Sequence, residues 1–188
     1  MRLRNSNDRW GGIAQLLHWG MAVLVVGMFP LGWYMVGLPL GPAKLDYYSW
    51  HKSFGLTIFA LVILRLAWRL ANPTPRLPAD TPRWERGAAH ASHVLLYALL
   101  VALPVAGYVI NSAANFPLSV FGWFSIPNMI AESESLKESA TLVHQVLGWV
   151  LLAVLAVHVA AALRHHVILR DDVLRRMLPG ARRGHESS

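Results

Sequence analysis

Four histidines lie within apolar stretches of the sequence, at His18, His51, His144 and His158. His144 and His158 are fourteen residues apart. At about 1.5 Å and 100° per residue, this spacing separates them by ~21 Å along a helix and returns them to nearly the same face. A bilayer hydrocarbon core is about 30 Å thick, so one imidazole is expected near each side of it. Neutral imidazoles are common metal ligands, and two layers of them across a membrane predict two haem centres.

Four apolar segments are long enough to hold these ligands in a bilayer, because each provides the ~20 residues that a helical crossing requires. We expect membrane-spanning helices at about 13–36, 48–70, 88–112 and 139–163. The chain is 55% hydrophobic and only 14% charged, whereas soluble domains have roughly 25% charged residues. Residues 1–188 are therefore predicted to form one all-α integral membrane domain. It is a four-transmembrane-helix bundle enclosing two haems, with a basic tail at 164–188 in solvent or among lipid headgroups.

Depth along the spans determines which histidines meet. His18 is near the start of the first span and His158 is near the end of the fourth, so both lie at one level. His51 and His144 are near the starts of the second and fourth spans, so both lie at the opposite level. Two bis-histidine sites at two depths are what a transmembrane electron path requires. All four histidines are therefore predicted to be axial ligands of haem iron.

The basic residues are divided between the two sides of the predicted bundle. All fourteen arginines lie in residues 2–9, 65–86 or 164–183, whereas the three lysines fall on the other side. Fourteen arginines less six acidic residues give +8 on the first side, and three lysines less four acidic residues give −1 on the second. Cytoplasmic loops of membrane proteins carry the excess of Lys and Arg. We therefore expect both termini in the cytoplasm, and the net charge of +7 indicates orientation and not nucleic-acid binding.

Cysteine is absent from the chain, which excludes disulfides, thiolate iron–sulfur clusters and haem linked through cysteine. Any haem is therefore held without a cysteine linkage. A haem plane also needs room against its helices, and four residues after each ligand comes a small residue: Ala22, Gly55, Gly148 and Ala162. Residues four apart share a helix face. These residues either make room for haem or allow close helix packing, and both interpretations can hold together.

Three further residues are candidates for contact with the haem propionates or with a quinone. Arg65 is fourteen residues after His51, so it lies on the same face at the level of the cytoplasmic haem. It is expected either to pair with a propionate or to extend toward cytoplasmic water. His90 and His93 lie at the cytoplasmic end of the third span, where they could donate hydrogen bonds to a propionate or to a quinone carbonyl.

Other polar residues near the spans have simpler interpretations. Lys52, beside an outer ligand, could neutralise propionates or attract an anionic reductant. His165 and His166 follow Arg164 in the headgroup zone and are expected at the surface. A reading of a different class also stays open, in which the histidines form a non-redox module that binds a transition metal or only packs helices. Zinc is disfavoured in it, because a pair of ligands leaves coordination positions open.

Several motifs follow one another in a specific order along almost the whole chain, about residues 7–180. They are Leu17-His18-Trp19, His51-x-x-x-Gly55, Arg65-Leu66-x-x-Arg69-Leu70, Asn72-Pro73-Thr74-Pro75, Ala89-His90-x-x-His93, Leu103-Pro104-x-x-Gly107, Ser135-Leu136-Lys137-Glu138 and Ala160-Ala161-Ala162-Leu163-x-His165-His166. Their order and spacing, with His144 fourteen residues before His158, resemble the bacterial cytochrome b561 family. The resemblance implies a multi-pass protein of the bacterial inner membrane. It also implies two non-covalent b-type haems, held by histidines at the four positions named above.

The resemblance also implies a function. Some members look like superoxide:ubiquinone oxidoreductases, which oxidise superoxide at the periplasmic side and pass the electron inward to ubiquinone in the membrane. Other relatives look like haem b subunits that anchor respiratory dehydrogenases, where a soluble redox protein is the donor. We expect the first role, with lipid, quinone and superoxide or a redox protein as partners. The dehydrogenase subunit is the alternative.

Overall fold

The main feature of the computed structural model, which describes residues 3–180, is a bundle of four long helices. The helices are α1 (Gly12–Gly37), α2 (Pro42–Leu70), α3 (Arg83–Ala113) and α4 (Glu134–Val167). Each contains one of the expected spans and is long and apolar enough to cross a membrane. The prediction of four membrane-spanning helices is therefore confirmed, and the helices extend somewhat beyond the predicted spans.

Local sequence accounts for where several helices begin and end. Pro42 opens α2 in the first turn, where its missing N–H costs nothing. Ser133 caps α4, because its side chain accepts the backbone N–H of Leu136 at 3.3 Å. The last turn of α4 contains the basic residues Arg164, His165 and His166. Basic side chains at this position stabilise a helix, because its C-terminal end carries a partial negative charge.

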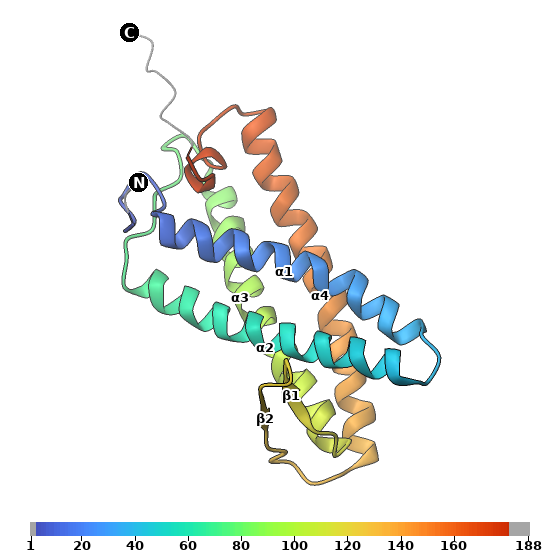
Figure 1. Ribbon diagram of the computed structural model, residues 1–188. Coiled ribbons are helices and arrows are strands. Elements are labelled where there is room, and N and C mark those ends of the chain that lie inside the picture. Colours follow the sequence, from blue (N-terminus) through green and yellow to red (C-terminus); the bar gives the residue numbers. More distant parts are fainter. Residues whose placement is uncertain (1–2, 181–188) are drawn as a thin grey trace.

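The four helices form two antiparallel pairs. α1 packs along α2, α3 packs along α4, and α2 also contacts α3. Figure 1 shows the first pair crossing the second at a steep angle. The starts of α1 and α3 and the ends of α2 and α4 share one end of the bundle, which we call the arginine-rich end. The opposite end contains Lys44, Lys52 and Lys137 and is called the lysine end.

The centre of the bundle is a small apolar cluster with one buried residue from each helix. The cluster consists of Val25, Ile58, Leu99 and Leu151. Leu151 lies seven residues, about two helical turns, from both His144 and His158. Val25 and Ile58 lie seven residues after the histidines of α1 and α2. The apolar core therefore separates two layers of histidines.

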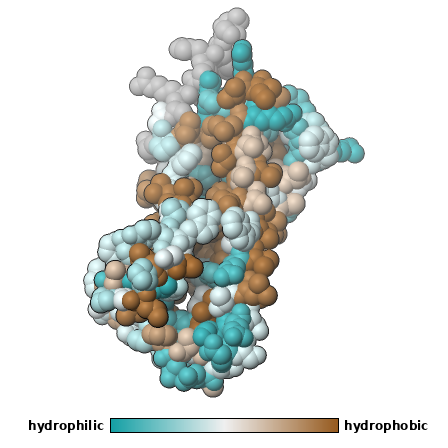
Figure 2. Space-filling model, turned by 90° about the vertical axis from the view of Figure 1, so that its right-hand side faces the viewer, coloured by the Kyte–Doolittle hydropathy of each residue, from teal (hydrophilic) through white to brown (hydrophobic). Residues whose placement is uncertain are grey.

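The outer surface of the helices is apolar, as a lipid-facing surface requires. Val23, Leu142 and Val157 are 71%, 63% and 65% exposed, although each lies in the middle part of its helix or close to it. In Figure 2, hydrophobic side chains cover the middle of the visible face, and hydrophilic side chains gather toward its two ends. This distribution agrees with a bundle surrounded by lipid.

A β-hairpin in the loop at the lysine end was not expected from the sequence. Strands β1 (Leu118–Val120) and β2 (Phe124–Ile126) pair antiparallel, with Ser119 opposite Ser125. At the tip, Phe121 and Gly122 have positive φ angles of 48° and 75°. Such angles match the turns that join two hairpin strands, and glycine adopts them without the steric cost that phenylalanine meets. The loop is thus an ordered element that packs on α2.

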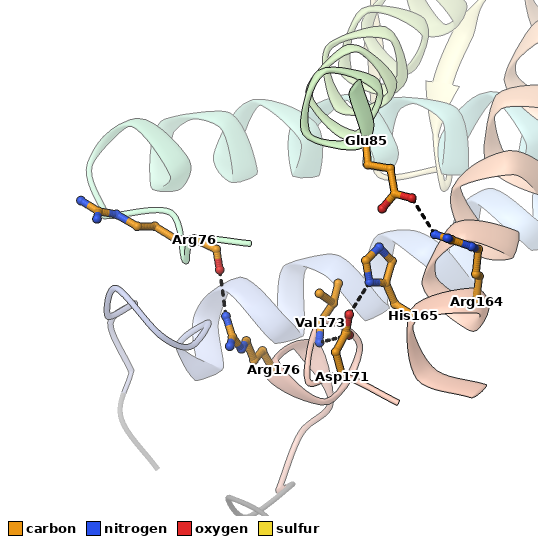
Figure 3. Close-up of polar contacts among 7 residues, drawn as sticks. All are labelled: Arg76, Glu85, Arg164, His165, Asp171, Val173 and Arg176. Carbon is orange, nitrogen blue, oxygen red and sulfur yellow. Dashed lines mark hydrogen bonds and ion pairs between the residues drawn. The ribbon is translucent and has the colours of Figure 1, made fainter. Parts of the chain in front are cut away.

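The segment after α4 folds back on the bundle, and its location in solvent or among lipid headgroups stays a prediction. Short helix η1 (Arg175–Met177) contacts the first turns of α1. There, Gln15 and Trp19 donate side-chain hydrogen bonds to the carbonyls of Arg176 and Met177 at 3.2 and 3.0 Å. Polar contacts of this segment with α4 and the α2–α3 loop are drawn in Figure 3. The rest of the predicted tail, 181–188, lies outside the described residues.

Candidate haem-binding site

The structure brings the four predicted histidines together in two pairs. At the lysine end, the rings of His51 on α2 and His144 on α4 have their centroids 6.2 Å apart and their planes at 67°. At the arginine-rich end, the rings of His18 on α1 and His158 on α4 are 6.3 Å apart at 66°. All four side chains are half-buried. The pairing by depth is thus what the structure shows, and the two pairs have nearly the same geometry.

The distance between the rings fits a metal ion between two imidazoles. Two metal–nitrogen bonds of about 2.0 Å and two ring radii add up to about 6 Å between centroids. Edge-to-face packing of aromatic rings covers the same range. The ring distance is therefore consistent with a bound metal and with edge-to-face packing. The hydrogen bonds of the ring nitrogens distinguish these two interpretations.

The ring of His144 is oriented by the neighbouring helix α3. Its Nδ1 lies 3.0 Å from the carbonyl oxygen of Leu103. A carbonyl only accepts, so Nδ1 carries the proton and Nε2 keeps its lone pair for a metal. A Cβ added at Gly107 would lie 3.5 Å from Cε1 of this ring. The Leu103-Pro104-x-x-Gly107 motif therefore holds the histidine of another helix.

His51 has a matching contact with α1. A Cβ added at Gly32 would lie 3.5 Å from Cε1 and 3.8 Å from Nδ1 of His51, the same distances that relate Gly107 to His144. Nδ1 of His51 is buried and has no hydrogen-bond partner among the described residues. Unlike the ring of His144, the ring of His51 is therefore positioned by shape, without a hydrogen bond that would place its proton. The ring spacing and the contacts of His144 support axial ligation at this pair.

Sequence reasoning missed the role of Gly32. Hydropathy does not distinguish this glycine from Gly20, Gly27 or Gly37 of the same helix, beside which an added Cβ meets nothing. One signal could have found it. Gly32 and Gly107 each follow a proline inside the helix by two or three residues, at Pro30 and Pro104.

The small residues that follow the outer ligands leave room beside them. A Cβ added at Gly148 would meet nothing within 4 Å, and one added at Gly55 would meet only the end of Met28 at 3.9 Å. Space for a flat group beside His51 and His144 is thus present.

The arginine-rich end adds a third histidine to its pair. The ring of His93 on α3 lies 5.4 Å from that of His158, and the indole of Trp19 lies 5.1 Å from the ring of His18. His93 is therefore at the level of the inner pair, where it was expected. His90 is exposed on α3. Contact of either residue with a propionate or a quinone stays a prediction.

Arg65 lies at the level of the inner pair and is held inside the bundle. Its Nε donates to the hydroxyl of Tyr97 at 3.0 Å, and its Nη1 donates to the carbonyl of Ala14 at 3.2 Å. Ala14 is one turn before His18. The expectation that Arg65 extends toward cytoplasmic water is therefore wrong, and pairing with a propionate stays a prediction.

The lysines and the last histidines have partners that the sequence did not reveal. Lys52 donates to Oδ1 of Asn111 at 3.1 Å, and Lys44 donates to the carbonyl of Leu38 at 2.8 Å. Lys137 pairs with Glu134. His165 lies 2.5 Å from a carboxylate oxygen of Asp171 (Figure 3). Nδ1 of His166 is buried. His165 and His166 are therefore half-buried and not fully at the surface, whereas an interaction of Lys52 with propionates or an anionic reductant stays a prediction.

Within residues 3–180, no group of three or more His, Asp or Glu side chains could hold a metal ion directly. Two imidazoles at each level therefore fit a metal that brings its other ligands with it, as iron does in a porphyrin. The reading as a metal-only binding module has no support in the described part of the chain.

Comparisons with known proteins show the family to which the chain belongs. A family model described as prokaryotic cytochrome b561 matches residues 9–180. Cytochrome b561 homolog 2 of Escherichia coli is 38% identical over 187 residues, which cover 95% of each chain. The probable superoxide oxidase CybB of Yersinia pestis is 30% identical over 88% of this chain and 93% of its own. Cytochrome b561 homolog 1 of Escherichia coli is 26% identical, over 87% and 93% of the two chains.

Proposed function

Because the chain belongs to the prokaryotic cytochrome b561 family of electron-transfer proteins in the bacterial inner membrane, we propose that it carries electrons across that membrane through two haem b groups. Family members bind haem b. The observation that supports two sites in this chain is the pair of histidine layers, each with ring centroids just over 6 Å apart, at the two ends of one helix.

The residues of the chain have distinct tasks in this proposal. His51 and His144 would hold the outer haem, and His18 and His158 would hold the inner one. Haem iron bound there would supply a one-electron redox couple. The carbonyl of Leu103 keeps the proton of His144 on Nδ1, so that Nε2 faces the metal site. Arg65, which donates hydrogen bonds to Tyr97 and Ala14, would neutralise a propionate of the inner haem.

The charge distribution supports an orientation with both termini in the cytoplasm. The arginine-rich end has a net charge of +8 and the lysine end −1. Such an excess of Arg marks the cytoplasmic side. In this orientation the His51–His144 pair lies at the periplasmic level and the His18–His158 pair at the cytoplasmic level.

Superoxide is the electron donor that we propose at the periplasmic side, and ubiquinone in the membrane is the acceptor. The relative from Yersinia pestis that is named a probable superoxide oxidase supports the donor, at 30% identity. In the overall reaction, superoxide loses one electron and becomes dioxygen. Two such electrons and two protons convert ubiquinone to ubiquinol.

Reconstituted protein can test this proposal. We expect an enzymatic source of superoxide to reduce the haem bands in liposomes, and short-chain ubiquinone to oxidise them again. Superoxide dismutase must abolish the reduction. Haem that stays oxidised under superoxide but is reduced by dithionite would refute the donor and leave the electron-transfer function standing.

A second candidate function is a cytochrome subunit that receives electrons from a dehydrogenase. It is favoured by the lysine end, where Lys44, Lys52 and Lys137 all have partners within the chain and form no free patch for an anion. The hairpin at this end exposes Trp123 and Phe124, which are 83% and 56% accessible. Aromatic side chains of this kind are common in protein interfaces. Co-purification with a dehydrogenase whose substrate reduces the haem would favour this function over superoxide oxidation.

A further inference from the structure

A groove of about 420 Å³ opens at the lysine end between α2 and the tip of the β-hairpin, apart from the histidine pairs. The residues that line it are Asp46, Ser49, Trp50, Phe54, Phe121 and Gly122. No part of the electron path described above uses this groove.

One wall of the groove is a stripe along α2. Asp46, Trp50 and Phe54 are spaced four residues apart, so they share one face of the helix. Asp46 lies one turn inside the start of α2, and Phe54 lies two turns deeper in the membrane. The stripe therefore begins with a carboxylate near water and continues as two aromatic rings toward the lipid core.

The opposite wall is held in place by a buried hydroxyl. Ser53 is 1% exposed, and its Oγ accepts the backbone N–H of Phe121 at 3.0 Å while donating to the carbonyl of Ser49 at 2.8 Å. The ring of Phe121 packs edge-to-face on Phe54 at 5.3 Å. Phe121 keeps a left-handed φ of 48°, which costs a phenylalanine on the order of 1–2 kcal/mol. Holding the ring of Phe121 beside the groove therefore lowers the free energy of unfolding by that amount.

The charge of the groove is negative. Asp46 is exposed and has no salt bridge among the described residues. Lys44, on the same helix, instead donates to the carbonyls of Val36 and Leu38. An anion would be repelled here. A ligand with a positive charge would meet both the carboxylate and the negative faces of aromatic rings, which is how proteins recognise organic ammonium groups.

From this arrangement we propose that the groove binds the ammonium head of a zwitterionic phospholipid in the outer leaflet, with the ammonium at Asp46 and Trp50. The lipid is favoured as the source because the groove lies at the membrane surface. Trp50 and Trp123 are 57% and 83% exposed there, as interfacial tryptophans are. The apolar side of the groove toward Phe54 continues in the direction of the acyl chains. This inference is independent of the electron donor and acceptor.

Native mass spectrometry of the haem-loaded protein tests the proposal. The protein is released from nanodiscs that contain equal amounts of phosphatidylethanolamine and phosphatidylglycerol. We expect the wild type to retain phosphatidylethanolamine selectively. Asp46→Asn and Trp50→Leu are expected to lower that retention about tenfold, because each removes one of the two attractions for the ammonium group.

Matched variants keep the test decisive. Trp84→Leu changes an exposed tryptophan at the arginine-rich end, far from the groove, so it must leave retention unchanged. Asp46→Glu keeps the charge and must retain the lipid. If Trp50→Leu fails to fold, the comparison of Asp46→Asn with Asp46→Glu carries the test alone.

Four results would overturn the inference. They are equal retention by Asp46→Asn and wild type, equal retention of phosphatidylglycerol, displacement of the lipid by a neutral quinol, and displacement by soluble ethanolamine at the same concentration as the lipid. The last two would assign the groove to a neutral ring or to a soluble cation.

Discussion

The two histidine pairs have nearly the same ring geometry, but their surroundings differ. At the lysine end, the rings of His51 and His144 lie against glycines of neighbouring helices, Gly32 and Gly107. At the arginine-rich end, the pair has a third histidine and a guanidinium nearby, and the chain beyond α4 covers this end of the bundle. The pair at the lysine end is thus surrounded by close glycine contacts, whereas the pair at the arginine-rich end has a charged side chain beside it.

This difference suggests a direction for the electron. Reduction adds one negative charge to a haem, and the cationic side chain of Arg65 at the level of the inner pair stabilises that charge. Within residues 3–180 the outer pair has no comparable arginine, since the arginines described there lie at the opposite end. We therefore expect the inner haem to have the higher midpoint potential, which draws electrons from the periplasmic to the cytoplasmic side.

The largest expected effect comes from filling the glycine contacts. Gly32→Leu and Gly107→Leu should each remove the outer haem, because the added side chain occupies the space that the ring of His51 or His144 needs. The haem content should fall by about half in the purified protein, as a pyridine haemochrome assay measures it.

Gly27→Leu is the matched control for both variants. It adds the same side chain at a glycine of α1 where a Cβ meets nothing within 4 Å. If this variant loses as much haem as Gly32→Leu, the loss reflects helix propensity and the shape argument for the outer site fails.

A second comparison separates ligand from neighbour at the inner end. His18→Ala should remove the inner haem, whereas His93→Ala should leave both haems in place, because His93 is proposed to be a neighbour of the ligand His158. Absorbance and EPR spectra of the low-spin haems measure the difference. Loss of the inner haem from His93→Ala, together with its retention in His18→Ala, would assign the ligand to α3.

A smaller effect is expected from charge alone. Arg65→Gln should lower the midpoint potential of the inner haem by on the order of 60 mV, the shift that a tenfold change in a one-electron equilibrium represents. The outer haem should shift much less, because Arg65 lies at the far end of the bundle. A spectroelectrochemical titration resolves both. Equal shifts of the two haems would remove the contrast between the ends.

The smallest effect concerns the segment that covers the arginine-rich end. Trp19→Phe removes the hydrogen bond to the carbonyl of Met177 and should weaken the docking of η1 by about 1 kcal/mol. Trypsin should then cleave after Arg175 and Arg176 faster than in the wild type. Trp33→Phe, at the other end of α1, is the control and should not change the cleavage rate.

The sequence predicted what depends on distance along one helix. The four spans follow from hydropathy, and the pairing of His18 with His158 and of His51 with His144 follows from depth. The contacts that orient the histidine rings could not be predicted, because they come from residues of neighbouring helices. The carbonyl of Leu103 lies beside His144, and Gly32 lies beside His51, each on another helix than the histidine. No local sequence pattern reveals these contacts.

The structure of the loop at 118–126 and of the segment after α4 was also not predicted from the sequence. The hairpin at 118–126 is held by Ser53 of α2, a contact between residues more than sixty positions apart. The segment at 175–178 docks through Gln15 and Trp19 of α1. Its basic composition predicted a tail in solvent or among lipid headgroups, and composition does not show that its backbone carbonyls find donors elsewhere in the fold.

The haem content of the purified protein, combined with a redox titration, tests the two-layer arrangement most directly. We predict about two haem b per polypeptide, titrating in two one-electron steps, and loss of only one step in His144→Ala. A protein that contains one haem, or none, with all four histidines intact would contradict it.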